Sequence, residues 1–386
     1  MPDVGAQFPN TSIDTSMETT IRGSVMVLLQ FDVSESIRLD RLRDLLPMRS
    51  PSSAAQPPDK LPAAAHVSYQ RPPVVEPLEA FILDSGEQLH GEIKYYDYCV
   101  VSVNCELAFT GNWDKLINLA SRWVWDVDFA GKADAIVRSR LEHFKTALIK
   151  PYKKWLSEDY LIFHAVEIAH TAQISGAPSV AELIRLHGLR IAQVVRGDTG
   201  QLAESETNDV LQSRISYYAN DLAVIGWNAA FLYDTKAGAQ TAIQLLEYSN
   251  SQLLEFRHYD QFLTEELDRV YKLLDGGTGM FARWRLARTA THLHTVLLDV
   301  AELTEHADNA IKFLSDMFAA RLYRLAALKV GVPDYKELVT RKVATAEDLY
   351  RFMVDQFNQS RAFFLELTVV IILAVELVFL FCGKPF

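Results

Sequence analysis

The chain has 386 residues, of which 49 % are apolar and 23 % are charged, a composition that is typical of globular proteins and excludes a disordered chain. Its formal net charge of −11 disfavours general binding to phosphate backbones, because such binding requires clustered lysine and arginine. The cysteines Cys99, Cys105 and Cys382 are too few for a disulfide framework and indicate a reducing compartment.

Two segments have the composition of irregular structure. Residues 1–20 are polar, and we expect them to be a disordered N-terminus. They resemble neither a secretory signal, which needs a basic and an apolar run, nor an arginine-rich transit peptide. Residues 47–77 contain repeated prolines among serine and alanine. Because such a stretch holds neither a strand ladder nor a helix, we interpret it as an insertion loop or a linker.

Residues 21–236 are predicted to form an α+β domain around that insertion. Apolar alternation and β-branched residues predict strands over 20–33, 92–96, 99–105 and 160–168. Helical periodicity predicts helices over 113–123, 133–148 and 180–194. Residues 215–227 fit either a strand entering a helix or two short strands. Strands and helices mixed without strict alternation indicate an α+β fold.

Residues 237–318 are predicted to form an antiparallel coiled-coil hairpin. Apolar residues recur there with a period of 3.5, which is typical of coiled coils. The run is interrupted at Gly276-Gly-Thr-Gly279, where the chain can end one helix and reverse. We expect the seam of the second arm to contain Leu286, Leu293, Val296, Val300 and Leu303. Residues 319–345 are then a connector.

Residues 346–386 are predicted to form an amphipathic helix that becomes a C-terminal transmembrane helix. Thr345 and Asp348 have the spacing of a capping box at its start. Residues 362–382 contain no lysine or arginine and are long enough to cross a hydrocarbon core of about 30 Å. The alternative is a buried helix in a soluble bundle. The transmembrane interpretation makes the protein tail-anchored, with its bulk facing the cytoplasm.

Two glutamates interrupt the apolar run of this last helix. Glu366 and Glu376 are ten residues apart, which places them about 80° apart around a helix. Because acids within a membrane usually face other protein, one packed interface could shield both. We therefore expect homo-oligomerisation through this helix, with Leu365 and Leu367 in the interface beside the glutamates.

Other residues suggest chemistry only weakly. His164, Glu167 and His170 lack the spacing that metal-binding helices need. His292, His294 and His306 flank the predicted seam, and Asp221 and Asp234 flank Trp227 without a spacing that catalysis requires. Arg283, Arg285 and Arg288 form a basic tip near the hairpin turn, which suits RNA, acidic lipid or a partner protein. The sequence indicates no catalytic residue, metal, cofactor or small-molecule substrate.

The order of these parts resembles a known family. The last helix contains Leu365-Glu366-Leu-Thr-Val-Val-Ile-Ile-Leu-Ala-Val-Glu376, which is similar to the ending of the RMD1-like family (required for meiotic nuclear division; domain of unknown function 155). The resemblance covers residues 79–386, and residues 1–78 depart from it. It implies a membrane-anchored, self-associating, non-enzymatic protein; mitochondrial members of that family support translation at the inner membrane. Because the N-terminus does not look like a transit peptide, the bacterial inner membrane is favoured over the mitochondrial one.

Three functions follow as hypotheses. The first is a membrane-anchored, self-associating scaffold or tethering protein without enzymatic activity. The second is a ribosome- or RNA-associated factor that uses the basic tip and supports translation. The third is a membrane-attached enzyme with a pocket near Tyr217, Tyr218, Asp221 and Trp227.

Overall fold

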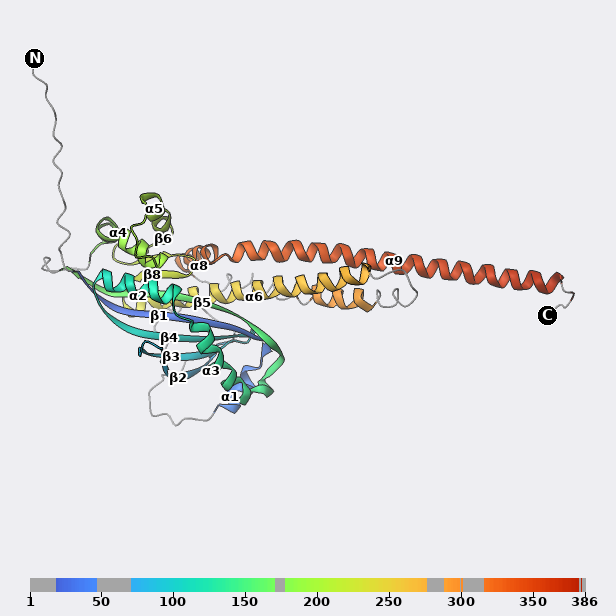
Figure 1. Ribbon diagram of the computed structural model, residues 1–386, viewed down its shortest axis with the longest axis horizontal. Helices are drawn as coiled ribbons and strands as arrows, with labels where there is room; N and C mark the ends of the chain where they lie inside the picture. Colours follow the sequence, from blue (N-terminus) through green and yellow to red (C-terminus); the bar gives the residue numbers. More distant parts are fainter. Residues whose placement is uncertain are drawn as a thin grey trace, which may run out of the picture. The chain divides into compact units, whose positions relative to one another are not determined.

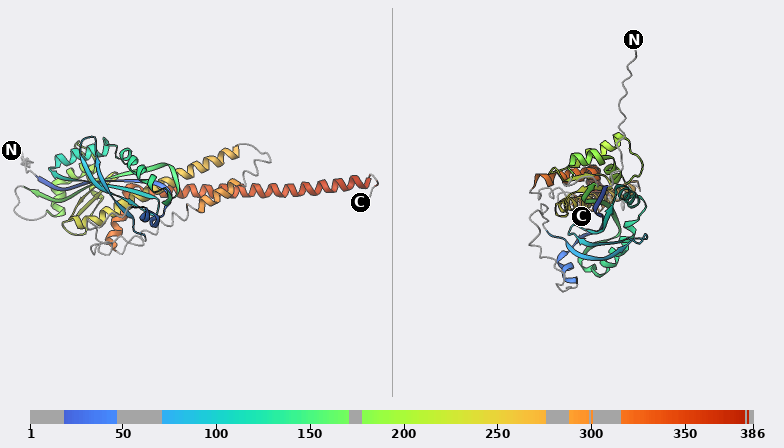
Figure 2. Two further views of the ribbon diagram at one scale, coloured as in Figure 1. Left: turned by 90° about the horizontal axis from the view of Figure 1, so that it is seen from below. Right: turned by 90° about the vertical axis from the view of Figure 1, so that its left-hand side faces the viewer.

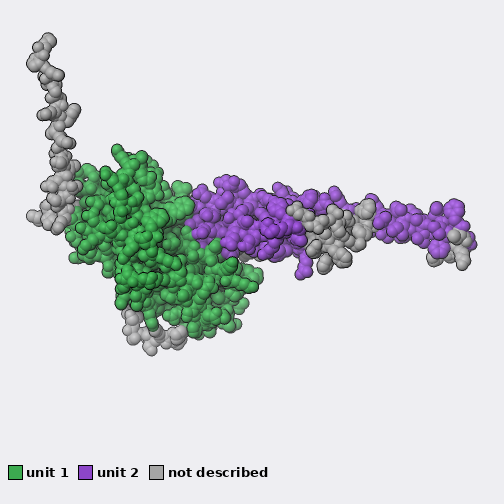
Figure 3. All heavy atoms as spheres, viewed as in Figure 1, with its two compact units in different colours: residues 1–251, 314–330 green, residues 252–313, 331–386 purple. Residues whose placement is uncertain are grey.

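The computed structural model describes residues 19–46, 71–170, 178–275, 288–298, 300, 316–381 and 383. The chain divides into two compact units, residues 1–251 with 314–330 and residues 252–313 with 331–386 (Figure 3). The helices are α1 (Leu39–Leu45), α2 (Trp113–Trp125), α3 (Phe129–His143), a 3-10 turn (Lys145–Ala147), α4 (Val180–Arg196), α5 (Glu204–Gln212), α6 (Lys236–Asp275), α8 (Met317–Val330) and α9 (Val332–Phe381), with a further helical stretch at 288–298.

The first unit is built on one sheet, whose described strands follow the order β2-β3-β4-β1-β5-β8-β7-β6 (Figure 1). They are β1 (Thr19–Ile37), β2 (Val74–Ile82), β3 (Gln88–Tyr95), β4 (Val100–Gly111), β5 (Leu148–His170), β6 (Arg214–Ile215), β7 (Leu222–Ile225) and β8 (Ala229–Tyr233). All neighbours pair antiparallel except β5 and β8, which run parallel. A parallel pair needs a crossover, and here the crossover contains α4, α5, β6 and β7.

Alternation along β1 gives the sheet two different faces. Val25, Val27 and Leu29 point into the apolar core, which also contains buried residues of α2, α3 and α4. Their neighbours Gln30 and Asp32 are also buried but lie on the opposite face, which the first turns of α6 cover (Figures 1 and 2). Side chains alternate across a strand, so one strand supplies both an apolar and a polar buried layer.

Gly23 of β1 lies directly against the backbone of β5. A Cβ atom at this position would lie 1.9 Å from the carbonyl oxygen of His164, so only glycine fits. The register of the two strands shifts between Arg22 and Gly23. Glycine at such an irregularity lets the two backbones stay paired where a side chain would separate them.

The strands predicted over 20–33, 92–96 and 99–105 are confirmed as parts of β1, β3 and β4. Of the two alternatives for 215–227, the structure has two short strands. The helix predicted over 133–148 ends at His143, because Leu148 already begins β5.

The prediction of irregular structure over the proline-rich residues 47–77 was wrong at the C-terminal end of that stretch. Residues 74–77 begin β2, and Pro77 is accommodated because β2 lies at the edge of the sheet. The rest of that stretch up to residue 70, and residues 1–18 of the predicted disordered N-terminus, lie outside the described residues.

The second unit contains the later turns of α6, the helical stretch 288–298 and α9. Its described core consists of Leu267, Val270, Ala290, Leu293, Leu297, Ala346 and Met353. Lys342 of α9 adds an ion pair to Asp260 of α6, with 2.5 Å between Nζ and Oδ1. The two helices predicted as a hairpin are therefore joined in one core by a third helix. The predicted reversal at 276–279 lies outside the described residues.

The connector expected over 319–345 is helical. Gly331, with a φ of 92°, separates α8 from α9, and Pro333 lies in the first turn of α9, where a missing N–H costs nothing. The start predicted at Thr345 was wrong, since Thr345 lies within α9. Its hydroxyl donates to the carbonyl of Arg341, the bond that a mid-helix threonine makes to the preceding turn.

The predicted transmembrane helix over 362–382 was also wrong. Among the described residues, no helix combines the length and the apolar character that crossing a bilayer requires. Glu366 and Glu376 leave nine uncharged residues between them. That is about 14 Å of helix, roughly half of a 30 Å hydrocarbon core. Three further predictions depended on this helix and are wrong as well. They are the tail anchor, the membrane location and the choice between bacterial and mitochondrial inner membranes.

Candidate functional site

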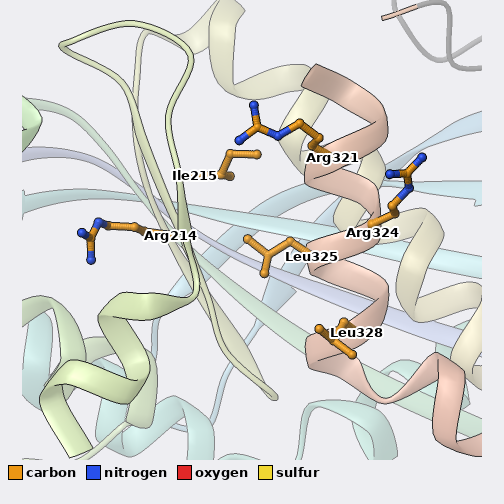
Figure 4. Close-up of a pocket in the computed structure, with 6 residues that line it drawn as sticks. All are labelled: Arg214, Ile215, Arg321, Arg324, Leu325 and Leu328. Atoms are coloured by element: carbon orange, nitrogen blue, oxygen red, sulfur yellow. The ribbon is translucent and has the colours of Figure 1, made fainter. Parts of the chain in front are cut away.

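A solvent-open groove of about 320 Å³ lies between β6 and α8, within the first unit (Figure 4). Its lining residues are Arg214, Ile215, Arg321, Arg324, Leu325 and Leu328. On α8, residues 321, 325 and 328 recur at the spacing that places side chains on one face of a helix. In Figure 4, Ile215 and Leu325 lie between the strand and the helix and form the apolar part of the groove.

The groove carries positive charge that the described residues do not neutralise. The α8 segment contains Arg321, Arg324 and Lys329 and no acidic residue. Arg321 and Arg324 are exposed, and no carboxylate in the described part of the chain forms an ion pair with either. Arg214 instead turns away from α8 and donates to the carbonyl of Leu211 at 2.7 Å. A chain with a net charge of −11 thus holds a small basic surface here.

Two exposed tyrosines follow β6. The Tyr217 ring contacts the Phe318 ring of α8 edge to face, with 5.1 Å between centroids. The Asp221 carboxylate accepts hydrogen bonds from the backbone N–H groups of Tyr217 and Tyr218, at 2.7 and 3.0 Å. Asp221, one of the two acids that flank Trp227, therefore holds this turn in shape. Trp227, the fourth residue of the predicted pocket, is exposed in the turn between β7 and β8.

Sequence reasoning missed the residues on the α8 side of the groove. Arg321 and Arg324 lie about a hundred positions after Tyr217, so no local pattern joins them. The available signal was the acid-free run of basic residues over 317–330, which stands out in an acidic chain.

His164, one of the residues considered for metal binding, lies buried in β5. Its Nε2 is 2.9 Å from the carbonyl oxygen of Asp234. Burial lowers the pKa of His164, and this outweighs the hydrogen bond to Asp234 and the nearby charge of Glu106, both of which raise it. Within the described residues, no group of three or more histidine, cysteine or acidic side chains is close enough to hold a metal ion.

Replacing His164 with glutamine is expected to reduce the loss of stability on acidification below about pH 6.5. The lowered pKa means that the unfolded chain binds a proton that the folded chain excludes, so stability falls as the pH falls through this region. Glutamine keeps a donor for the Asp234 carbonyl but does not titrate. Urea unfolding of both proteins at pH 7.5 and pH 5.5 measures the effect. An unchanged difference between the two pH values would contradict it.

The polar face of the sheet contains a buried ion pair. The Lys94 ammonium lies 2.8 Å from one carboxylate oxygen of Glu247 in α6, and Asn104 donates to the other at 3.1 Å. Gln30 donates to the backbone carbonyl of Glu247 at 2.8 Å. Burial raises the pKa of Glu247, but the Lys94 charge and the hydrogen bonds outweigh it and hold the pKa below its usual value. The carboxylate is therefore ionised and fixes α6 against the sheet.

The predicted coiled-coil seam lies partly inside the second unit. Leu293, Val296 and Val300 are buried, while Leu286 and Leu303 lie outside the described residues. Of the flanking histidines, His294 stacks on Tyr350 of α9 and His292 lies 3.4 Å from Glu266 of α6. Of the predicted basic tip, only Arg288 is described, and it is exposed; Arg283 and Arg285 lie outside the described residues.

The last turns of α9 form an exposed apolar surface over residues 365–381. Thirteen large apolar side chains in this stretch are exposed, from Leu365 and Leu367 to Phe381. They surround the helix instead of forming one stripe, and Glu366 and Glu376 are exposed among them. These thirteen side chains are 39–82 % exposed, so together they exceed the roughly 300–600 Å² of the largest apolar patch on a typical monomer.

Residues 22–240 match the model of the family described as "Uncharacterized protein MJ0711, N-terminal domain". This match covers more than half of the chain, so the chain belongs to that family. It is similar to "Uncharacterized protein MJ0711" of Methanocaldococcus jannaschii, with 20 % identity over 188 residues, 49 % of this chain and 58 % of the relative. The chain thus spans less than two thirds of that relative. No solved structure matches the chain.

The expected membership of the RMD1-like family is therefore wrong. Neither comparison points to that family. The most specific part of the resemblance was the pair of glutamates at 366 and 376, which lies outside the matched range 22–240. The matched range contains nearly all of the described sheet.

Proposed function

We propose that this protein is a self-associating scaffold whose copies are joined through the last turns of α9. The observation that carries the proposal is the exposed apolar surface over 365–381. Apolar area of that size is costly in water, at about 25 cal/mol per Å². A stable interface buries about 800 Å² on each partner, and this helix end contributes apolar area toward it.

The arrangement of the acids favours another copy of the same helix as the partner. At 100° per residue, Glu366 and Glu376 lie within about 80° of each other. The opposite side contains Thr368, Ile371, Val375 and Val378, which have the a and d spacing of a heptad. Copies that pack through this side bury β-branched residues against each other and leave both glutamates in water. A symmetric pair of identical surfaces meets these requirements.

Ending the chain after residue 360 is expected to convert an oligomer into a monomer. The described core of the second unit extends only to Met353, so this truncation leaves it intact. Sedimentation velocity of the full and the shortened chain, across a hundredfold range of concentration, measures the change in mass. If both chains sediment as monomers, or both as the same oligomer, the proposal fails.

A matched pair of variants locates the interface. Ile371→Asp with Val375→Asp places two charges on the side opposite the glutamates, and the full chain is expected to become monomeric. Val369→Asp with Leu373→Asp places the same charges on the glutamate side, and this variant is expected to keep its mass. Equal effects of the two pairs would overturn the heptad arrangement.

A further inference from the structure

The groove between β6 and α8 has an apolar floor that folding leaves uncovered. Ile215 lies on the strand side, and Leu325 and Leu328 lie one turn apart on the helix. Leu328 is 60 % exposed, although leucine in a helix that packs on a sheet usually points inward. A volume of about 320 Å³ is at the lower end of the roughly 300–1,000 Å³ of ligand sites, so it suits a few side chains.

The rim of the groove adds cationic and aromatic side chains. Arg321 and Arg324 are exposed beside the leucines, without an acidic partner in the described part of the chain. Tyr217 and Tyr218 extend the surface beyond Arg321, through the contact of Tyr217 with Phe318. Arginine and tyrosine are, with tryptophan, enriched among the residues that contribute most to the energy of protein interfaces.

We propose that this groove, defined by Arg321, Arg324, Ile215 and Leu328, docks an acidic peptide segment of a partner protein whose apolar anchor residues alternate with its acids. The carboxylates would meet the two arginines, since guanidinium groups bind carboxylates in a bidentate geometry. The anchors would fill the apolar floor. All four residues belong to the first unit, so the proposal is independent of self-association through α9.

The same surface fits a nucleic acid less well. Single-stranded RNA uses arginine and tyrosine, but it needs a positively charged track along its backbone. Here only two exposed arginines border an apolar floor, so the groove offers no such track. A peptide with both acids and leucines matches the floor as well as the rim.

Fluorescence anisotropy of the full chain with a labelled twelve-residue peptide of repeating Glu-Leu-Ala tests the proposal. Arg321→Glu with Arg324→Glu is expected to weaken binding of this peptide at least tenfold. Leu328→Ser, which leaves both charges in place, is expected to weaken it severalfold. A peptide with glutamine in place of every glutamate is expected to bind at least tenfold more weakly than the acidic peptide.

The matched control is Arg41→Glu with Arg185→Glu, which changes the net charge equally at exposed positions outside the groove and is expected to leave binding unchanged. Equal weakening by the control would show a general charge effect and overturn the proposal. So would the absence of saturable peptide binding to the unmodified chain. Tighter binding of a twelve-nucleotide oligouridylate, lost in the Arg321→Glu, Arg324→Glu variant, would assign the groove to RNA instead.

Discussion

Replacing Lys94 with methionine is expected to destabilise the sheet unit by about 3–5 kcal/mol, because it leaves the Glu247 carboxylate buried without its cation. Glu247 is 1 % exposed, so water cannot replace the lost ammonium. Methionine keeps most of the length and the apolar stem of lysine, which limits the change to the charge. Urea unfolding at pH 7, followed by tryptophan fluorescence, to which the buried Trp123 contributes, measures the difference.

Two further variants distinguish the effect of the unpaired Glu247 charge from the effect of lost packing. Glu247→Gln in the Lys94→Met background removes the stranded charge but keeps an acceptor for Asn104, so it is expected to recover at least half of the lost stability. Lys132→Met breaks the more exposed pair with Asp84 and is expected to cost less than about 1 kcal/mol. If the double variant is no more stable than Lys94→Met alone, the ion pair does not explain the effect.

The same pair predicts a dependence on pH. Folding lowers the pKa of Glu247, so the stability that its carboxylate contributes is present above its unfolded pKa of about 4.5 and is lost as the pH falls through the folded value. Glu247→Gln removes this contribution. The acid side of the stability curve is therefore expected to be shallower for the Gln variant than for the native chain.

Replacing Leu293 with aspartate is expected to unfold the second unit without dissociating any assembly first. Leu293 is 1 % exposed and packs in a core that α6 and α9 of the same chain complete. Burying an unpaired carboxylate there, in addition to losing the leucine contacts, is expected to cost more than about 4 kcal/mol. A seam between separate chains would instead give a folded monomer.

Hydrogen exchange distinguishes these outcomes. In Leu293→Asp, amides of α9 over 332–353 and of α6 over 252–275 are expected to lose protection, while amides of β1 and β5 keep theirs. Leu298→Asp is the matched control, since Leu298 lies in the same helical stretch but is 58 % exposed, and its expected effect is within about 0.5 kcal/mol. Retained protection in Leu293→Asp would contradict the described core.

Local sequence patterns predict the individual strands of the sheet better than the order in which those strands pair. The alternation of Val25, Val27 and Leu29 predicts a strand, because each apolar residue marks the same face. It does not indicate that β1 lies between β4 and β5, since pairing is decided by contacts between residues far apart in the sequence. The buried polar face was missed for a related reason: Lys94 and Glu247 look like surface residues until α6 covers them.

The C-terminal half shows where periodicity misleads. The heptad spacing around Leu293 indicated a seam between two helices. The spacing alone does not determine how many helices pack at that seam, and in the structure Met353 of α9 belongs to the same core. The groove could not be predicted from local sequence, because Ile215 and Leu328 meet only after the chain has returned to the sheet. The apolar composition of 365–381 was evident, yet composition alone does not identify what covers it.

Strand β1 is synthesised before either of the two strands that pair with it. One of its edges pairs with β4, with Ile21 opposite Gly111, and the other with β5, with Thr19 opposite His170. At about 5–20 residues per second, the chain needs roughly 7–27 s to grow from Ile37 to His170. During that interval a 19-residue strand rich in valine and leucine has a free edge. This edge of β1 therefore stays without its β5 partner until residue 170 has been made, and slower translation before that point is expected to prolong the interval.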